Sequence, residues 1–238
     1  MGGVDAEAGV TANLLVTPAE LAGERVVVEG EAYRHLFRAR RLASDARLRL
    51  VDGEGRARWA EVAAIDRKCA ELRLLGEAPA HDATRRVELL VAAPRPERAA
   101  WLVEKATELG VAAVRFLASE RAVRGVDVKS LARLRRIAGA ALEQCGGARL
   151  PALSGPHDFA ELPQLGLPGV LYLLEPEAAE PLPVGGEVAA AVLVGPEGGW
   201  TEDELATLAL IATPVRLGER VLRVETAAIA AAALLIAR

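Results

Sequence analysis

Two glycine-containing segments near the carboxyl end constrain the fold of this chain more than any other feature. The first is Gly-Pro-Glu-Gly-Gly-Trp-Thr-Glu-Asp-Glu-Leu, residues 195–205, and the second is Leu-Gly-Glu-Arg-Val-Leu-Arg-Val-Glu-Thr-Ala, residues 217–227. Short apolar runs precede them, Ala189 to Val194 and Pro214 to Leu217. Each run predicts a buried strand, and each segment predicts a loop that opens a helix. Paired loops at the carboxyl ends of strands are where open α/β sheets bind ligands.

The first loop matches neither of the common nucleotide-binding loops. No Gly-Lys-Ser/Thr follows it, so it is not a Walker A loop, and the GxGxxG pattern of dinucleotide sites is absent. An ordinary tight turn with a good helix cap is the alternative to a ligand-binding loop. Thr201, followed three residues later by Glu204, predicts a capping box and explains part of the pattern by itself.

Taken together, the two segments closely resemble the C-terminal signature of the RsmE family, the ribosomal RNA uridine-N3 methyltransferases of the SPOUT superfamily. The resemblance continues upstream in Glu104 to Gly110, in Ser119 to Arg121 and in Glu143 to Gly146, and it covers most of residues 13–238. It implies an α/β fold, with a C-terminal SPOUT α/β trefoil-knot domain and a smaller N-terminal PUA-like β-barrel. We expect the RNA-binding barrel over residues 11–76 and the methyltransferase domain over residues 84–238.

The order of the predicted strands and helices divides the chain into two parts near residues 76–86. Before this point the predicted strands are short, with one helix over Glu31 to Leu42. After it, strands and helices alternate, which is typical of a mostly parallel sheet covered by helices on both faces. One helix is predicted over Glu97 to Leu109, closed by Gly110, and another over Ser130 to Gln144 with Ser130 as its cap.

The resemblance implies S-adenosylmethionine as cofactor, bound by the three loops that follow the last strands. Glycine, proline and leucine dominate these loops, which fits a ligand held mostly by backbone groups in an apolar slot. Glu197 could instead cap its own loop. The residues expected to bind the cofactor are Leu174, Glu175, Val194, Gly195, Pro196, Glu197, Gly198, Gly199, Leu217, Gly218, Val221, Leu222 and Thr226.

Methylation of uracil N3 requires removal of a weakly acidic proton or stabilisation of the resulting anion. Arg220 and Arg223, beside the second loop, are the candidate electrostatic stabilisers. Glu225 is the candidate proton acceptor, or it holds an arginine in place. Because Arg223 and Glu225 alternate along what is predicted as an extended segment, a purely structural ion pair between them is the alternative.

Net charge is unevenly distributed along the 238 residues. The chain is acidic overall, with formal charge −4, yet residues 33–50 contain six arginines and residues 115–136 contain seven basic residues. Localised basic faces suit an enzyme that approaches RNA phosphates in one orientation, and a solvated helix face is the alternative. The residues expected to contact RNA are Arg34, His35, Arg38, Arg40, Arg41 and Arg121, the last of which could equally have a surface role.

Other features narrow the class of protein. Two cysteines make no disulfide framework, no metal-ligand spacing is present, and no apolar run has the length of a membrane span, so a cytoplasmic protein is expected. The implied partners are 16S ribosomal RNA or the small ribosomal subunit and a second copy of the chain. Two alternatives remain: a C5-uridine methyltransferase that uses Cys145 as nucleophile, and a non-catalytic RNA-binding or ribosome-assembly protein on the same fold.

Overall fold

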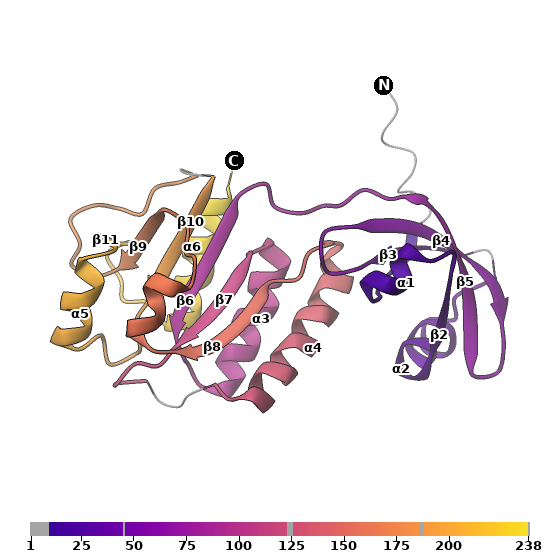
Figure 1. The fold of residues 1–238 in the computed structure, drawn as a ribbon, viewed down its shortest axis with the longest axis horizontal. Helices are drawn as coiled ribbons and strands as arrows, with labels where there is room; N and C mark the ends of the chain where they lie inside the picture. Colours follow the sequence, from indigo (N-terminus) through magenta and orange to yellow (C-terminus); the bar gives the residue numbers. More distant parts are fainter. Residues whose placement is uncertain (1–9, 45, 123–125, 186–187, 238) are drawn as a thin grey trace, which may run out of the picture. The chain divides into compact units, whose positions relative to one another are not determined.

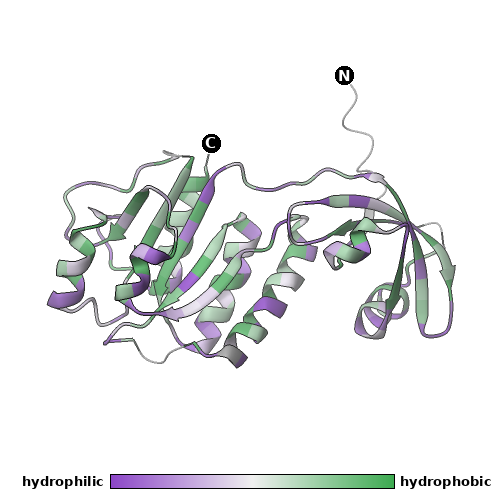
Figure 2. Cartoon of the chain, viewed as in Figure 1, coloured by the Kyte–Doolittle hydropathy of each residue, from purple (hydrophilic) through white to green (hydrophobic). Residues whose placement is uncertain are grey.

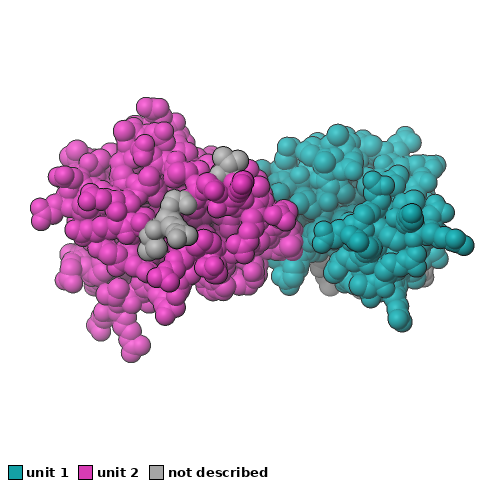
Figure 3. All heavy atoms as spheres, turned by 90° about the horizontal axis from the view of Figure 1, so that it is seen from below, with its two compact units in different colours: residues 1–82, 142–150 teal, residues 83–141, 151–238 magenta. Residues whose placement is uncertain are grey.

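The chain divides into two compact units. The computed structural model describes residues 10–44, 46–122, 126–185 and 188–237. The first unit contains residues 1–82 together with 142–150, and the second contains residues 83–141 and 151–238 (Figure 3). The sequence predicts a division near residues 76–86, and the first unit indeed divides from the second after Asp82. Nothing in the sequence indicates that residues 142–150 belong to the first unit.

The first unit is built on a five-stranded sheet (Figure 1). Its strands run in the order β1-β3-β4-β5-β2, with β1 parallel to β3 and every other pair antiparallel. Leu48, Leu50 and Leu72 are fully buried in its core. All strands except the first are predicted by the sequence. Their bounds are β1 Val10–Leu15, β2 Arg25–Glu29, β3 Arg47–Val51, β4 Ala57–Ile65 and β5 Cys69–Glu77.

The helix predicted over Glu31 to Leu42 is wrong in form. The chain makes one α-helical turn, α2 (Gly30–Tyr33), and continues as a π-helical segment, η1 (Arg34–Ala39). The segment ends before Arg41, which has φ 54°. An α-helix and a π-helical turn would both bury Tyr33 and its neighbours, so hydrophobic spacing alone cannot distinguish them.

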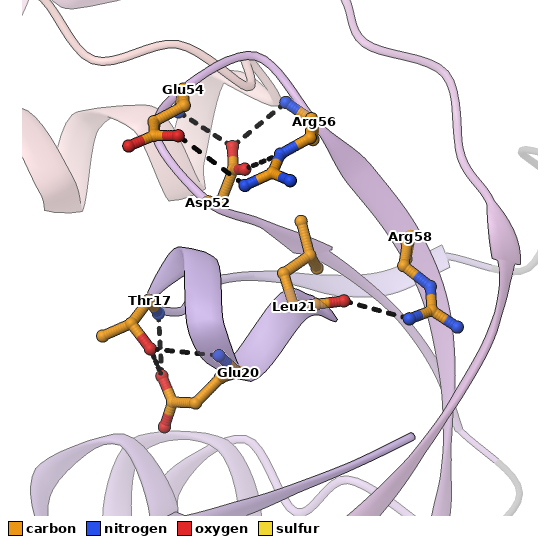
Figure 4. Close-up of polar contacts among 7 residues, drawn as sticks. All are labelled: Thr17, Glu20, Leu21, Asp52, Glu54, Arg56 and Arg58. Atoms are coloured by element: carbon orange, nitrogen blue, oxygen red, sulfur yellow. Dashed lines mark hydrogen bonds and ion pairs between the residues drawn. The ribbon is translucent and has the colours of Figure 1, made fainter. Parts of the chain in front are cut away.

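Side chains accept hydrogen bonds from backbone N–H groups at two places in this unit, the start of α1 and the turn after β3 (Figure 4). Helix α1 (Pro18–Ala22) begins with a capping box, in which Thr17 Oγ1 accepts from the Glu20 backbone and Glu20 accepts from the Thr17 backbone. In the turn after β3, the Asp52 carboxylate accepts from the backbone N–H groups of Glu54 and Arg56 at 2.8 and 3.0 Å. Each of these bonds satisfies a backbone donor that the turn or helix end leaves free.

Residues 142–150 are tied to the first unit by hydrogen bonds. Asn13 Nδ2 donates to the Glu143 carbonyl at 2.9 Å, and the Glu143 carboxylate accepts from the Leu15 backbone N–H at 2.8 Å. The buried Arg49 donates to the Gly146 carbonyl at 2.9 Å. Burial raises the pKa of the Glu143 carboxyl. Strands β1 and β3 therefore obtain polar partners from a segment about 100 residues further along the chain.

The second unit contains a six-stranded parallel sheet in the order β11-β9-β10-β6-β7-β8 (Figure 1). Strands β6, β7 and β8 follow one another in chain order on one side of the sheet, whereas β10, β9 and β11 lie in that order on the other side of β6. Strand β8 is not predicted by the sequence. The bounds are β6 Arg86–Ala92, β7 Ala113–Leu117, β8 Ala152–His157, β9 Val170–Leu174, β10 Ala189–Val194 and β11 Thr213–Val215.

Helices cover both faces of this sheet, which confirms the predicted α/β class. Helix α6 packs against β6, β10 and α3 on one face. On the other face Leu90, Leu173 and Leu193 contact residues of α5 and of the 3₁₀ turn η2, and the apolar strands are green in Figure 2. The helices are α3 Pro96–Leu109, α4 Val128–Cys145, α5 Glu202–Ala209 and α6 Val224–Ile236, and η2 spans Phe159–Gln164.

Two helix ends test the predicted caps. Gly110 ends α3 in the left-handed conformation, with φ 78°, as predicted. The cap predicted for α4 is wrong, because the Asp127 carboxylate accepts from the Ser130 backbone N–H at 2.7 Å and α4 begins at Val128. Ser130 is therefore already inside the helix.

Candidate functional site

A cavity of about 290 Å³ lies where β9, β10 and β11 end in the second unit. The three strands are neighbours and parallel, so their carboxyl ends open at the same edge of the sheet. A hydrogen bond of 2.9 Å from the Glu175 backbone N–H to the Val215 carbonyl joins two of these ends. The volume is close to the lower end of the range for small-molecule sites, roughly 300–1,000 Å³. Three loops, which follow Leu174, Val194 and Val215, form its walls.

The structure brings together most residues expected to bind a cofactor. Eleven of the thirteen line this cavity, and Gly198 and Thr226 do not. Gly198 faces the side chain of Arg121, and Thr226 lines a different cavity. The lining residues are Leu174, Glu175, Pro176, Val194, Gly195, Pro196, Glu197, Gly199, Trp200, Leu205, Leu217, Gly218, Arg220, Val221, Leu222, Val224 and Ala227.

Trp200 is the lining residue that sequence reasoning most clearly missed. Its side chain is buried and meets the Phe159 ring edge to face, with ring centroids 5.5 Å apart. A Cβ on Gly195 would lie 2.8 Å from Trp200 Nε1, so only glycine allows this close approach. The indole N–H group is therefore buried against Gly195 without a partner in the part of the chain that the structure describes.

Residues that follow β7 form hydrogen bonds with the loop that follows β10. Arg121 donates to the carbonyls of Gly198 and Trp200 at 3.1 and 3.3 Å. Thr201 caps α5 through the predicted capping box with Glu204, and the same carboxylate also accepts from the Glu120 backbone at 3.0 Å. The Ser-Glu-Arg motif thus holds the loop in shape. This contact gives Arg121 a structural role next to the cavity, where the sequence suggested RNA contact or a surface position.

The cavity combines an apolar wall with two carboxylates, Glu175 and Glu197, and one guanidinium, Arg220. Val221 is 83% exposed and Leu222 is 39% exposed although both line it, so a ligand in the cavity would cover apolar surface that now faces water. Burial raises the pKa of the Glu175 carboxyl. Arg220 is exposed at the rim and lines the same space. These residues suit a ligand that carries both apolar and cationic groups.

The candidate catalytic residues occupy different positions around the start of α6. Arg220 lines the cavity, whereas Arg223 is the exposed N-cap residue of α6. The extended segment predicted over Arg223 and Glu225 is wrong, because α6 begins at Val224. Glu225 instead forms an ion pair with Arg98 of α3, so the alternative of a pair with Arg223 is also wrong. Sequence could not show this partner, since Arg98 lies 127 residues away.

Four of the six arginines in residues 33–50 form, with His35, an arginine block that is exposed to solvent, whereas Arg47 is half-buried and Arg49 is buried. Arg34, His35 and Arg38 lie on η1, and Arg40 and Arg41 follow it, all with exposed side chains. The Arg38 guanidinium lies 5.7 Å from the centroid of the Tyr33 ring and donates to the Arg67 carbonyl at 2.7 Å. The block therefore presents a basic surface, with Arg38 held in place by an aromatic ring and a carbonyl.

Cys145 is not among the residues that line the cavity. It is the last residue of α4, in the segment that belongs to the first unit, and its thiol contacts the Leu142 carbonyl at 3.6 Å. In the described ranges no group of three or more His, Cys, Asp or Glu side chains could hold a metal ion. No helix in the same ranges combines the length and apolar character that crossing a bilayer requires.

Comparison with protein families gives two matches. The family described as an RNA methyltransferase domain matches residues 81–236, which contain the cavity. The family described as an RNA methyltransferase PUA domain matches residues 28–75, which contain the arginine block. The boundary between the two matches agrees with the division of the chain after Asp82.

Individual relatives agree with these matches over most of the chain. Ribosomal RNA small subunit methyltransferase E of Mycobacterium bovis is 32% identical over 222 residues, which cover 87% of this chain and 84% of that protein. The protein of the same name from Synechocystis is 29% identical, over 90% of this chain and 73% of that one. The crystal structure of a ribosomal RNA small subunit methyltransferase E from Neisseria gonorrhoeae, bound to S-adenosyl methionine, is 28% identical, with a TM-score of 0.83 over 93% of this chain and 95% of that one.

Proposed function

This chain belongs to the RsmE family of ribosomal RNA small subunit methyltransferases, and on that premise we propose that it methylates N3 of a uridine in 16S ribosomal RNA, using S-adenosylmethionine. The observation that carries the proposal is the cavity at the ends of β9, β10 and β11, lined by eleven of the residues expected to bind the cofactor. The protein acts in the cytoplasm, where ribosomal RNA is made and modified in bacteria. The trefoil knot implied by the family resemblance stays a prediction.

The residues around the cavity fit S-adenosylmethionine. Glycine at position 195 leaves room for the Trp200 indole, which lines the cavity beside the loop. Leu217, Val221 and the other apolar lining residues suit the adenine ring, and the Glu175 carboxylate suits a cationic group. When bound, S-adenosylmethionine supplies a methyl group on a positively charged sulfur, which keeps the electron pair of the carbon–sulfur bond.

The residues of the chain must then prepare N3 of the uracil. Its proton is weakly acidic, and its loss spreads negative charge over O2, N3 and O4. Arg220, at the rim of the cavity, is the closest candidate for stabilising this charge, and Arg223 lies three residues further at the N-cap of α6. Glu225 is the candidate proton acceptor. The methylated product has no imino hydrogen at N3, and the reaction requires no covalent bond between protein and RNA.

We propose that the arginine block of the first unit binds RNA phosphates. Arg34, Arg38, Arg40 and Arg41 with His35 form an exposed basic surface in the part of the chain that matches the PUA family. Basic side chains that neutralise phosphates release bound counterions, so binding through this surface weakens as salt rises. Arg121 of the second unit joins this set only if it contacts RNA while it holds the Gly198 carbonyl.

We also propose a homodimer. Helix α6 is apolar on nearly all sides, and Ile229, Ala230 and Ala233, at helical spacing on one face, are partly or fully exposed. An exposed apolar stripe of this kind is typical of an interface. Sedimentation of the purified protein measures its mass directly. Ala233→Arg is expected to shift the dimer toward monomer, and a wild-type protein that sediments as a monomer contradicts the proposal.

The experiment that tests the function uses ribosomes from host cells that lack this gene. Small subunits and 16S ribosomal RNA from these cells are incubated with the protein and S-adenosylmethionine, and the nucleosides are identified by mass spectrometry. We expect 3-methyluridine at one position, and Cys145→Ala is expected to keep the activity. Formation of 5-methyluridine that is lost in Cys145→Ala would establish C5 methylation instead. Failure to bind S-adenosylmethionine, with RNA binding retained, would establish a non-catalytic RNA-binding protein.

A further inference from the structure

The structure divides the basic stretch of residues 115–136 into side chains that are engaged within the second unit and side chains that are not. Three of its seven basic residues already bind a buried carboxylate or backbone carbonyls: Arg115, Arg121 and Arg135. Arg124 lies outside the described residues. The remaining three all belong to α4, and they are Lys129, Arg133 and Arg136.

These three cations lie on one face of α4, which runs beside the edge strand β8 (Figure 1). Spacings of four and three residues place them within about 60° of one another around the helix axis. All three side chains are exposed, as are those of Ala132 and Ala140 near them. The buried residues of the helix lie on the opposite side: Leu131, Leu134, Ala138, Ala141 and Leu142. Helix α4 is therefore packed on one side and basic on the other.

Arg133 and Arg136 have no partner in the part of the chain that the structure describes. Neither forms a hydrogen bond, an ion pair or a ring contact with another described residue. No acidic residue occurs between positions 128 and 141. Lys129 interacts with Asp127, the capping residue of the helix, so its charge is partly compensated. A protein with formal charge −4 thus carries a local basic face whose two arginines are available to an anionic partner.

The composition of this face favours the phosphate backbone of RNA over its bases. Residues 129–140 contain no aromatic side chain on which a base could stack, and no amide that could read a base edge. Single-stranded RNA is usually held by stacking, whereas double-stranded RNA is recognised through its shape and its phosphates. The exposed alanines are small and leave room for a backbone to approach the helix. These features favour a paired segment of RNA.

We propose that Lys129, Arg133 and Arg136 form a docking surface for the phosphate backbone of a paired segment of ribosomal RNA, an inference that rests on the proposed function. The surface belongs to the unit that matches the methyltransferase family, so this unit holds RNA by itself, in addition to the arginine block of the first unit. It contributes affinity without reading sequence and without touching the reacting atoms.

Arg133→Gln combined with Arg136→Gln tests the surface, because glutamine keeps the helix propensity and removes the charge. We expect Kd for 16S ribosomal RNA to rise about tenfold near physiological salt, and the slope of log K against log salt to become shallower by about 2. At saturating RNA, kcat is expected to change less than about twofold, since the contact is made equally before and during the reaction.

The matched control is Arg86→Gln combined with Lys105→Gln. It removes the same charge from two cations of the second unit that already pair with carboxylates. We expect this variant to bind RNA with nearly the wild-type salt slope. Equal losses in the two double variants would reduce the effect to net charge and overturn the inference.

Rescue separates charge from structure. Arg133→Lys combined with Arg136→Lys keeps two cations that contact phosphates as point charges. We expect the salt slope of the wild type and an affinity within about threefold of it. If the lysine variant binds RNA as weakly as the glutamine variant, phosphate contact is not what α4 supplies.

The form of the RNA tests whether the partner is paired. A fully paired RNA duplex and poly(A) of the same length are bound to the wild type and to the glutamine variant. We expect the variant to lose about tenfold in affinity for the duplex and less than about twofold for poly(A). Equal losses would overturn the assignment to paired RNA, and no loss for either would make the face a solvated helix surface. Since binding requires no catalysis, absence of methylation by the wild type would refute the proposed function and leave the docking surface to be decided by binding alone.

Discussion

The two regions expected to bind ligands are built in opposite ways. The loops around the first cavity are fixed by backbone hydrogen bonds, by a glycine that admits an indole, and by Arg121, which is engaged with two loop carbonyls. The arginine block of the first unit consists of side chains that extend into solvent from a short π-helical segment. The first region recognises shape through its backbone, and the second attracts charge through side chains. Single substitutions should therefore act sharply in one region and gradually in the other.

The largest effect is expected for Arg220→Ala, because Arg220 is the cation at the rim of the first cavity. Removal of one stabiliser of developing negative charge lowers kcat by about 100- to 1,000-fold. Single-turnover methylation of 16S ribosomal RNA measures this loss. Arg223→Ala is expected to lose less, since Arg223 is exposed at the N-cap of α6 and does not line the cavity. The reverse order would move the anion-stabilising role to Arg223.

The next effect concerns the close contact between Gly195 and Trp200. In Gly195→Val the new side chain meets the indole, where even a Cβ would approach Nε1 to 2.8 Å. Overpacking of this kind costs about 2–3 kcal/mol, so Kd for S-adenosylmethionine is expected to rise by roughly 30- to 150-fold in calorimetry. Gly169→Val is the control, because nothing lies within 4 Å of a Cβ at Gly169 and this residue does not line the cavity. Equal losses in both variants would show that the indole contact is not what matters.

Substitutions in the arginine block should lower RNA affinity gradually. Arg38→Ala combined with Arg41→Ala removes two exposed cations, one of which lies over the Tyr33 ring. RNA affinity is expected to fall about tenfold near physiological salt, and the slope of log K against log salt should decrease by about 1 for each lost phosphate contact. Filter binding at several salt concentrations measures both. An unchanged slope would make the block a solvated surface without a role in RNA binding.

The smallest expected effect is the dependence of S-adenosylmethionine affinity on pH, which we attribute to the Glu175 carboxyl. Burial raises the pKa of this carboxyl, so its ionisation destabilises the empty protein as pH rises through that pKa. A cation in the cavity favours the ionised form, and affinity for S-adenosylmethionine should therefore fall severalfold as pH drops through the same pKa. The demethylated product, which has a neutral sulfur, should show a weaker dependence. If Glu175→Gln keeps the full pH dependence, another group is responsible.

The features that sequence predicts here are those that depend on neighbouring residues. Gly110 ends α3 because a left-handed residue is needed there, and Thr201 with Glu204 caps α5 through atoms three residues apart. Most cavity residues were predictable for a similar reason, since they follow directly after the strands that position them. Local patterns of this kind are contained in a short stretch of chain.

The features that sequence misses depend on contacts between distant residues. Arg98 and Glu225 are 127 positions apart, so their ion pair leaves no local pattern. Trp200 could be identified as a residue of the loop, but its burial against Phe159 depends on the packing of η2. The wrong cap for α4 has a simpler cause: Asp127 and Ser130 are both good capping residues, and hydrophobic spacing could not decide between them.

The return of residues 142–150 to the first unit has a consequence for the order of events during synthesis. Asn13, Leu15 and Arg49 leave the ribosome early, but their partners Glu143 and Gly146 follow only after residues 83–141 have been translated. Domains usually fold in order as they emerge, N-terminal first. Here the first unit stays incomplete until more than half of the chain has been made. Its last stabilising contacts therefore form while the second unit is already partly synthesised, which couples the maturation of the two units in time.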